Sequence, residues 1–444
     1  MFIWSSYDYM SQIATERYSS IRVYDLSLQK PMDPNVDDLN SHGISPIEGD
    51  DNDGEGDCEM VVEEDENEDR EPVTLGFVEK PKNPTSLLRH FFPSKAGGVP
   101  AWLDPLNLPG VKSRSCGFCE NPLQFLLQIY APISENESAF HRVLYVFMCP
   151  SMSCLLKDQH EQWKCRTDGF SPRSVKVFRY QLPRDNVFYS RDPPKYDGSD
   201  KPSGPGAPLC CWCGTWKGDK VCGSCKTARY CSENHQVVHW RSGHKTVCQR
   251  IILSSKDDSN PTDTNLQMKN IVACNTLWPE YEIVHEDECL SDDNDGDEVL
   301  KDNGSIASSI VSSKPNAEDD EEFNALENKF EADDDNKSWA TFQVCIGKDP
   351  EQVLRYCRDV KGAAPLWPVS AGKPSKQDIP KCCHCSNPMF YEFQILPQLL
   401  YYFDLKNEAD SVDWATVVVY TCSASCKPDR TGFTHEFPWV QIQP

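Results

Sequence analysis

Short runs rich in aromatic and β-branched residues recur along the 444-residue chain. Each run is four to eight residues long and is bounded by Pro, Gly, Asn or Asp, a pattern typical of β-strands. The runs cover residues 123–130, 142–148, 175–182, 281–284, 391–396, 415–421 and 437–442. Helical signals are fewer, so the pattern predicts an α+β protein that is predominantly β.

Two segments carry helical signals. The first extends from Ser232 to Arg250. The second begins with Asp349 and Pro350, which suit the N-cap and the first turn of a helix, and continues to Arg355. We therefore expect a helix in each segment.

Several motifs occur twice, 265 or 266 residues apart. The repeated motifs are Gly97-x-x-Pro100-x-Trp102 with Gly362-x-x-Pro365-x-Trp367, and Cys116-x-x-Cys119-x-Asn121-Pro122 with Cys382-x-x-Cys385-x-Asn387-Pro388. Each copy ends with a hydrophobic strand that runs into a second cysteine pair. We infer two homologous β-rich halves that form one body.

Each half contains four cysteines that antiparallel strand pairing would bring together, as in a zinc ribbon. The two sets are Cys116, Cys119, Cys149 and Cys154 in the first half, and Cys382, Cys385, Cys422 and Cys426 in the second. The alternative is that these cysteines are small buried apolar side chains, because the closing pairs are spaced more loosely than a usual zinc knuckle. Cys383 and His384 also leave the ligand choice in the second half open. We expect one further zinc ion in each half, and the interpretation of these cysteines as buried apolar side chains remains the alternative.

The net charge of −25 is concentrated in two acidic blocks. Residues 48–71 carry −13 and residues 286–335 carry −16, so the rest of the chain is close to neutral. This distribution is typical of acidic disordered segments joined to globular modules, and it disfavours direct sequence-specific binding to nucleic acid. A basic protein partner is favoured instead.

Composition therefore divides the chain into six parts. We expect a disordered acidic tail (1–72), a first repeat half (73–205), a cysteine-rich finger (209–249), a return segment (250–284), an acidic disordered linker (285–336) and a second repeat half, the C-terminal domain (337–444). The sequence shows no apolar stretch of membrane-spanning length and no signal peptide. With 22 cysteines, this predicts a protein of a reducing compartment, the cytoplasm and also the nucleus, without a membrane partner.

The central segment holds eight soft or borderline metal donors at knuckle and helical spacing. They are Cys210, Cys213, Cys222, Cys225, Cys231, His235, His244 and Cys248. Each i,i+4 pair, Cys231 with His235 and His244 with Cys248, can complete a tetrahedral site with one Cys-x-x-Cys knuckle. About 40 residues cannot bury an adequate core, so metal binding would provide the folding free energy. Two zinc ions are expected.

This spacing resembles the MYND zinc finger. The resemblance implies interleaved sites, with Cys210, Cys213, Cys231 and His235 binding one ion and Cys222, Cys225, His244 and Cys248 the other. His235 stands where many MYND fingers have cysteine. His239 is a competing donor that we interpret as a surface helix residue, and Cys211 is a spare thiol.

The finger between two cysteine-paired halves is similar to the programmed cell death protein 2 family. The similarity is carried by residues 95–102, 125–132, 178–184 and 393–400, and it covers about residues 73–444 apart from the acidic linker. It implies a zinc-binding chaperone, not an enzyme, dedicated to a basic client. That client is a small-subunit ribosomal protein, number five in the universal nomenclature, and the chaperone supports 40S subunit biogenesis and rRNA processing, with the pre-40S particle as a further partner.

Two other classes of function were weighed. An enzyme is disfavoured, because the chain has no Gly-rich cofactor loop and no supported nucleophile, and zinc sites with four protein ligands are structural. A MYND adaptor in transcriptional regulation or cell-death control is the alternative. In that case Trp240 is the candidate binding residue, although it can equally pack over a zinc site.

Overall fold

The computed structural model describes residues 73–164, 172–195, 205–254, 278–288, 334–358, 360, 362–405, 411–427 and 432–442. The tail expected at 1–72 and most of the acidic linker expected at 285–336 lie outside these residues. At the edges of that linker, a strand continues to Asp287 and a helix begins at Asp334. No helix within the described ranges is long and apolar enough to cross a membrane.

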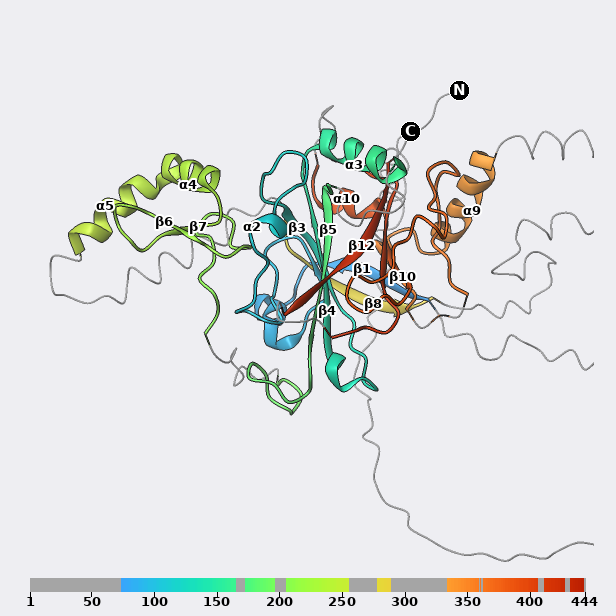
Figure 1. The fold of residues 1–444 in the computed structure, drawn as a ribbon, viewed down its shortest axis with the longest axis horizontal. Coiled ribbons are helices and arrows are strands. Elements are labelled where there is room, and N and C mark those ends of the chain that lie inside the picture. Colours follow the sequence, from blue (N-terminus) through green and yellow to red (C-terminus); the bar gives the residue numbers. More distant parts are fainter. Residues whose placement is uncertain are drawn as a thin grey trace, which may run out of the picture. The chain divides into compact units, whose positions relative to one another are not determined.

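Ten strands form a closed barrel in the order β1-β8-β2-β3-β4-β5-β12-β11-β10-β9, and every neighbouring pair is antiparallel (Figure 1). The strands are β1 (Thr74–Glu79), β2 (Lys95–Ala96), β3 (Gln124–Tyr130), β4 (His141–Met148), β5 (Val175–Leu182), β8 (Tyr281–Asp287), β9 (Leu354–Tyr356), β10 (Met389–Ile395), β11 (Thr416–Cys422) and β12 (Phe433–Gln441). The predominantly β prediction is confirmed, and all seven predicted runs are strands.

Short helices connect the strands. They are η1 (Pro84–Leu87), η2 (Arg89–Phe91), α2 (Val111–Arg114), η3 (Glu137–Ala139), α3 (Met152–Lys164), α9 (Asp334–Lys348) and α10 (Gln398–Tyr402). The finger adds β6 (Lys220–Val221), β7 (Arg229–Tyr230), α4 (Glu233–His239), the π-helical turn η4 (Trp240–His244) and α5 (Lys245–Ser254). The helix predicted over Ser232 to Arg250 is confirmed as three consecutive helical segments, capped by the Ser232 side chain.

Two strands pair outside the segments to which the sequence assigns them. β1 lies in the first half (73–205) but pairs with β9 of the second, while β8, which begins in the return segment, pairs with β2 of the first half. The barrel closes through two seams between the halves, β1 with β8 and β5 with β12. The halves therefore share one continuous sheet.

Alternate side chains of the strands fill the barrel interior. One core cluster draws buried residues from strands around the whole barrel, including Leu127, Val146, Val177, Phe393 and Val419. Because neighbouring residues of a strand point to opposite faces, the remaining positions of β4 and β5 face outward. These outward residues pack into a second cluster with the finger.

The helix predicted from Asp349 to Arg355 is wrong. α9 ends at Lys348, and Asp349 and Pro350 lie in the turn that follows it. The chain then enters β9, where the Val353 amide donates to the Gly76 carbonyl (2.8 Å) and Leu354 is fully buried. Pairing with two strands and burial in the barrel outweigh a local capping signal.

Gly97 offers a test of the close packing between the β2 turn and the chain before β8. Its φ is +63°, and an added Cβ would lie 1.8 Å from the Pro279 carbonyl oxygen. We expect Gly97→Ala to lower the free energy of unfolding by about 2–4 kcal/mol, because it adds backbone strain and overpacking. Urea unfolding measures this, with Gly110→Ala as the control, since nothing lies within 4 Å of a Cβ there. Equal stability of the two variants would contradict the packing described.

Candidate metal centres

Four groups of cysteine and histidine side chains come together in the described structure. In each group the donor atoms all lie within 4.8 Å of one another. The groups are Cys116, Cys119, Cys149 and Cys154; Cys210, Cys213, Cys231 and His235; Cys222, Cys225, His244 and Cys248; and Cys382, Cys385, Cys422 and Cys426. The structure thus brings together each of the four sets singled out from the sequence.

Distances between the donor atoms suit a tetrahedral ion. Zn–S bonds of about 2.3 Å place two sulfurs of a tetrahedron about 3.8 Å apart. Pairs of sulfurs from the four groups lie 3.4 to 3.9 Å apart, and all of these cysteines are free thiols. The donor sets therefore fit Zn²⁺, and these separations exclude disulfide bonds, whose sulfurs lie about 2.05 Å apart.

The four Cys-x-x-Cys knuckles share one backbone geometry. The residue after the second cysteine has a positive φ of 58° to 66° in each, and its amide donates to the carbonyl of the first cysteine. These residues are Glu120, Gly214, Lys226 and Ser386. This tight turn points both sulfurs of a knuckle to the same side, which a shared metal ion requires.

The first finger site joins the knuckle of Cys210 and Cys213 to the start of α4. Cys231 follows β7 directly, and His235 lies one turn into α4, where its amide donates to the Ser232 hydroxyl (3.1 Å). The Cys213 and Cys231 sulfurs are 3.8 Å apart, and the Cys210 sulfur is 3.7 Å from His235 Nδ1. All four ligands are buried.

The second finger site joins the next knuckle to the π-helical turn and α5. Cys225 Sγ lies 3.8 Å from His244 Nε2, and the sulfurs of Cys222 and Cys248 are 3.9 Å apart. Gly243, with a φ of 141°, precedes His244 in the π-helical turn. Because the ligands of the two sites alternate along the chain, the finger has interleaved sites, as the resemblance to MYND fingers implies.

Each barrel half builds its cluster in the same way. The knuckle lies just before β3 or β10, and the other two cysteines lie at the end of β4 or β11 and shortly after it. Isolated bridges, Ser115 with Pro122 and Lys381 with Pro388, close the two knuckles. The strands that follow carry an irregularity at equivalent places, between Phe125 and Leu127 and between Tyr391 and Phe393.

Local hydrogen bonds favour the thiolate form of one cysteine in each of three clusters. The hydrogen bond with Cys149 lowers the pKa of Cys116 to about 5. The backbone N–H of Asn387 lowers the pKa of Cys385 to about 7. In the finger, hydrogen bonds within its cluster lower the pKa of Cys210 far below the usual thiol range. The same contacts raise the pKa of the partner thiols Cys149 and Cys231 above the usual thiol range, so the simultaneous ionisation of all the thiols in a cluster requires a bound cation.

The competing donors lie outside the clusters. His239 is buried, so the interpretation of it as a surface residue is wrong, and its Nδ1 lies 3.1 Å from the Tyr230 hydroxyl. Cys211 accepts the Arg229 amide, and Cys383 is exposed. The indole of Trp240 packs beside the second site, with its ring centroid 5.9 Å from that of His244. The side chain is also 38% exposed, so part of it is accessible to a binding partner.

The finger is docked on the barrel by two buried side chains that sequence reasoning missed. Trp216 packs on Phe147, and its indole N–H donates to the Leu123 carbonyl (2.8 Å). Arg114 donates from α2 to the Cys231 carbonyl (2.6 Å) beside the first zinc site. A tryptophan and an arginine in polar segments gave no sequence signal for this interface.

Trp216→Ala should detach the finger from the barrel. Removing this fully buried indole should cost about 3–5 kcal/mol of docking, from lost burial and an unpaired carbonyl. Faster limited proteolysis between the finger and the barrel, together with faster hydrogen exchange of β3 and β4, would report the loss of docking. The finger should keep its zinc. The control Trp240→Ala, at an exposed position, should behave as the wild type; equal resistance to proteolysis in both variants would contradict the docking role.

Comparison with known proteins gives matches along most of the chain. Family profiles match the N-terminal domain of programmed cell death protein 2 over residues 72–196, the MYND finger over 210–248 and the C-terminal domain of programmed cell death protein 2 over 336–442. No solved structure matches.

Individual relatives give the same picture. Programmed cell death protein 2 of Bos taurus is 38% identical over 381 residues, which cover 83% of this chain and 96% of the relative. The Mus musculus protein of the same name is 36% identical over 378 residues, with the same coverage. "Probable 20S rRNA accumulation protein 4" of Schizosaccharomyces pombe is 31% identical over 121 residues, 24% of this chain and 28% of the relative.

Proposed function

Because the chain belongs to the programmed cell death protein 2 family, we propose that it is a zinc-binding chaperone dedicated to one small-subunit ribosomal protein, number five in the universal nomenclature. The observation that carries this proposal is the match to that family along both halves and the finger. The relative named for 20S rRNA accumulation supports a role in ribosome biogenesis. We place the activity in the cytoplasm and the nucleus, with the pre-40S particle as the later partner.

Charge supports a basic client. The chain carries −25, mostly in two acidic blocks, whereas ribosomal proteins that bind rRNA carry clustered positive charge. An acidic chaperone attracts such a client over a distance and shields it until rRNA replaces the shield.

The metal centres support a non-enzymatic role. Each of the four clusters offers four protein donors, which leaves no open position for a substrate or an activated water. We propose four structural zinc ions, two in the MYND finger and one in each half. Equivalent knuckles, bridges and strand irregularities 266 residues apart support the further inference that the two halves are homologous.

An adaptor is the second candidate function, favoured by one surface of the finger. Val237 and Trp240 are three residues apart on the helical segment beside the second zinc site and are 45% and 38% exposed. Such a surface suits a peptide with apolar anchors. An adaptor would work through this surface alone, whereas a chaperone would use the barrel and the acidic segments.

Co-expression of the full chain with the ribosomal protein tests the proposal. We expect a soluble stoichiometric complex on size exclusion, unchanged by Trp240→Ala. An unrelated ribosomal protein of similar positive charge is the matched control and should remain insoluble. If the proposed client stays insoluble as well, the chaperone proposal is wrong. If the complex forms but Trp240→Ala abolishes it, the finger surface is the binding site and the adaptor becomes the better description.

A further inference from the structure

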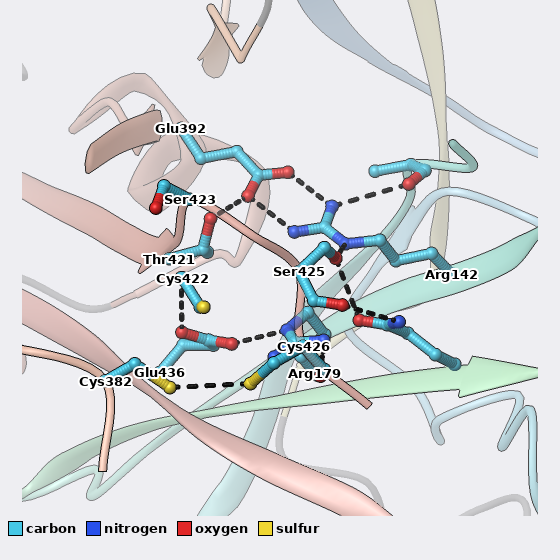
Figure 2. A network of polar contacts seen from close by, with 12 residues as sticks. Arg142, Arg179, Cys382, Glu392, Thr421, Cys422, Ser423, Ser425, Cys426 and Glu436 are labelled. Atoms are coloured by element: carbon cyan, nitrogen blue, oxygen red, sulfur yellow. Dashed lines mark hydrogen bonds and ion pairs between the residues drawn. The ribbon is translucent and has the colours of Figure 1, made fainter. Parts of the chain in front are cut away.

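Side chains of the first half hold the metal-ligand loop of the second half. The loop runs from Cys422 at the end of β11 to Cys426 (Figure 2). The Ser425 hydroxyl accepts a hydrogen bond from Arg142 Nε (3.1 Å) and donates to Gln181 Oε1 (2.9 Å). The Ser425 carbonyl accepts from Gln181 Nε2 (3.1 Å). Arg142 and Gln181 belong to β4 and β5 on the other side of the β5–β12 seam.

Arg179 of β5 contacts the metal ligand Cys426 directly. Its Nη1 donates to the Cys426 carbonyl (3.0 Å), and its Nη2 lies 3.9 Å from the Cys426 sulfur. Its Nε pairs with Glu436 of β12, whose other carboxylate oxygen accepts the Cys422 amide (3.0 Å). Two of the four ligands are therefore fixed by a buried ion pair that crosses the seam (Figure 2).

The buried charges next to this cluster are suited to an anionic metal centre. The network contains the guanidinium groups of Arg142, Arg179 and Arg358 and the carboxylates of Glu392 and Glu436, which leaves one positive charge in excess. The side chains of Arg142 and Arg179 are fully buried. A zinc ion with four thiolates carries two negative charges, so the excess guanidinium charge faces an anionic centre and offsets half of its charge.

The first-half cluster is held differently. The Cys149 amide donates to the backbone carbonyl of Ser174 in the first half (2.8 Å), whereas the equivalent Cys422 amide donates to the Glu436 carboxylate that pairs with Arg179. Ser153 precedes the last ligand of this cluster, as Ser425 does in the second, but its hydroxyl bonds to the nearby Ser151 hydroxyl (2.9 Å). The first-half cluster therefore provides a matched control.

We propose that the second-half cluster is a zinc site whose outer shell is supplied by the first half, so that zinc binding there closes the β5–β12 seam. Zinc fixes the Cys422–Cys426 loop, and the loop fixes Arg142, Arg179 and Gln181 across the seam. This inference rests on the zinc that the proposed function assigns to this cluster. Outer-shell residues of this kind change metal affinity by about 10- to 100-fold.

Ser425→Ala, which changes no ligand, tests the coupling in one direction. In the full-length zinc-loaded protein, we expect a chromophoric chelator to remove one zinc ion about 10- to 100-fold more readily than from the wild type. Alkylation mass spectrometry should show that Cys382, Cys385, Cys422 and Cys426 are the thiols exposed. Ser153→Ala should release zinc as the wild type does. Wild-type release from Ser425→Ala would overturn the proposal.

The double variant Cys382→Ser/Cys385→Ser tests the other direction. Hydrogen exchange should accelerate across the seam, in residues 139–143 and 179–182 of the first half. Cys116→Ser/Cys119→Ser should leave these two segments protected. Acceleration confined to residues 381–426 would overturn the proposal. If the four wild-type thiols alkylate as fast as free thiols in zinc-loaded protein, the cluster holds no zinc; the coupling then fails, while complex formation with the ribosomal protein remains a separate result.

Discussion

Replacing Cys222 and Cys225 with serine should unfold the finger and remove two zinc ions from the protein. The two sites are interleaved, and His235 of the first site, on α4, is followed without a break by His244 and Cys248 of the second, on η4 and α5. Losing one knuckle therefore frees the helical segment that carries both sites. A segment of this size has too little apolar core to remain folded alone, whereas zinc contributes about 10–16 kcal/mol to such modules.

Zinc content and hydrogen exchange measure this effect. We expect the double variant to lose protection throughout residues 209–254, while the barrel strands other than β3 and β4, against which the finger docks, keep theirs. Cys211→Ser is the matched control, because this thiol lies in the other knuckle of the finger, between Cys210 and Cys213, but outside both clusters. The control should retain the wild-type zinc content. Unchanged zinc content in the double variant would show that the ligand assignment is wrong.

Spacing along the chain predicted the candidate sites well because metal ligation imposes local rules. A Cys-x-x-Cys turn and an i,i+4 pair on a helix each hold their two donor atoms in nearly fixed positions relative to one another, independently of the rest of the fold. Seven of the ten barrel strands were predictable for a similar reason, since their hydrophobic runs are local, whereas β1 and the two-residue β2 were not among the predicted runs. β9 was missed because only three residues pair there, after a convincing helix cap at Asp349.

Features that depend on distant parts of the chain were not predictable. The pairing of β1 with β9, and of β8 with β2, is not indicated by the sequence of either β1 or β8. Trp216 and Arg114 act across the interface between the finger and the barrel, more than 90 residues from their partners. A weak signal did exist for the buried charges, because Arg179 and Glu392 interrupt otherwise apolar or aromatic runs. An isolated charge in a strand that must be buried implies an equally buried partner.

Replacing Arg142 with methionine should be among the most destabilising single changes in the barrel. The side chains of Arg142 and Glu392 are both fully buried and form a bidentate ion pair, with Nη1–Oε1 at 2.5 Å and Nη2–Oε2 at 2.7 Å. Removing one partner of a buried pair typically costs about 3–5 kcal/mol, and here Glu392 would lose its bidentate partner and keep only Arg358, at 3.3 Å, as a compensating charge. Urea unfolding at pH 7 measures the loss.

A second substitution separates the charge from the packing. In Arg142→Met/Glu392→Gln the uncompensated carboxylate is gone, but an acceptor remains for Tyr356 and Thr421. We expect the double variant to regain about 1–3 kcal/mol of the loss. Lys164→Met, which breaks an exposed pair with Glu161, is the control and should change stability by less than about 1 kcal/mol. A double variant no more stable than Arg142→Met would show that lost packing dominates.

The pH dependence of Arg142→Met gives an independent check. Burial alone would raise the pKa of Glu392, but in the wild type the Arg142 guanidinium holds it at about 2. The wild-type carboxylate therefore contributes stability above its ordinary pKa, and this contribution is lost only as the pH falls toward 2. Without Arg142, burial should dominate and raise this pKa above its unfolded value, so the folded variant takes up a proton on acidification. Between pH 8 and 5.5 the variant should gain stability relative to the wild type as the pH falls, and a constant difference over this range would mean that Arg358, 3.3 Å from the same carboxylate, is sufficient to keep it ionised.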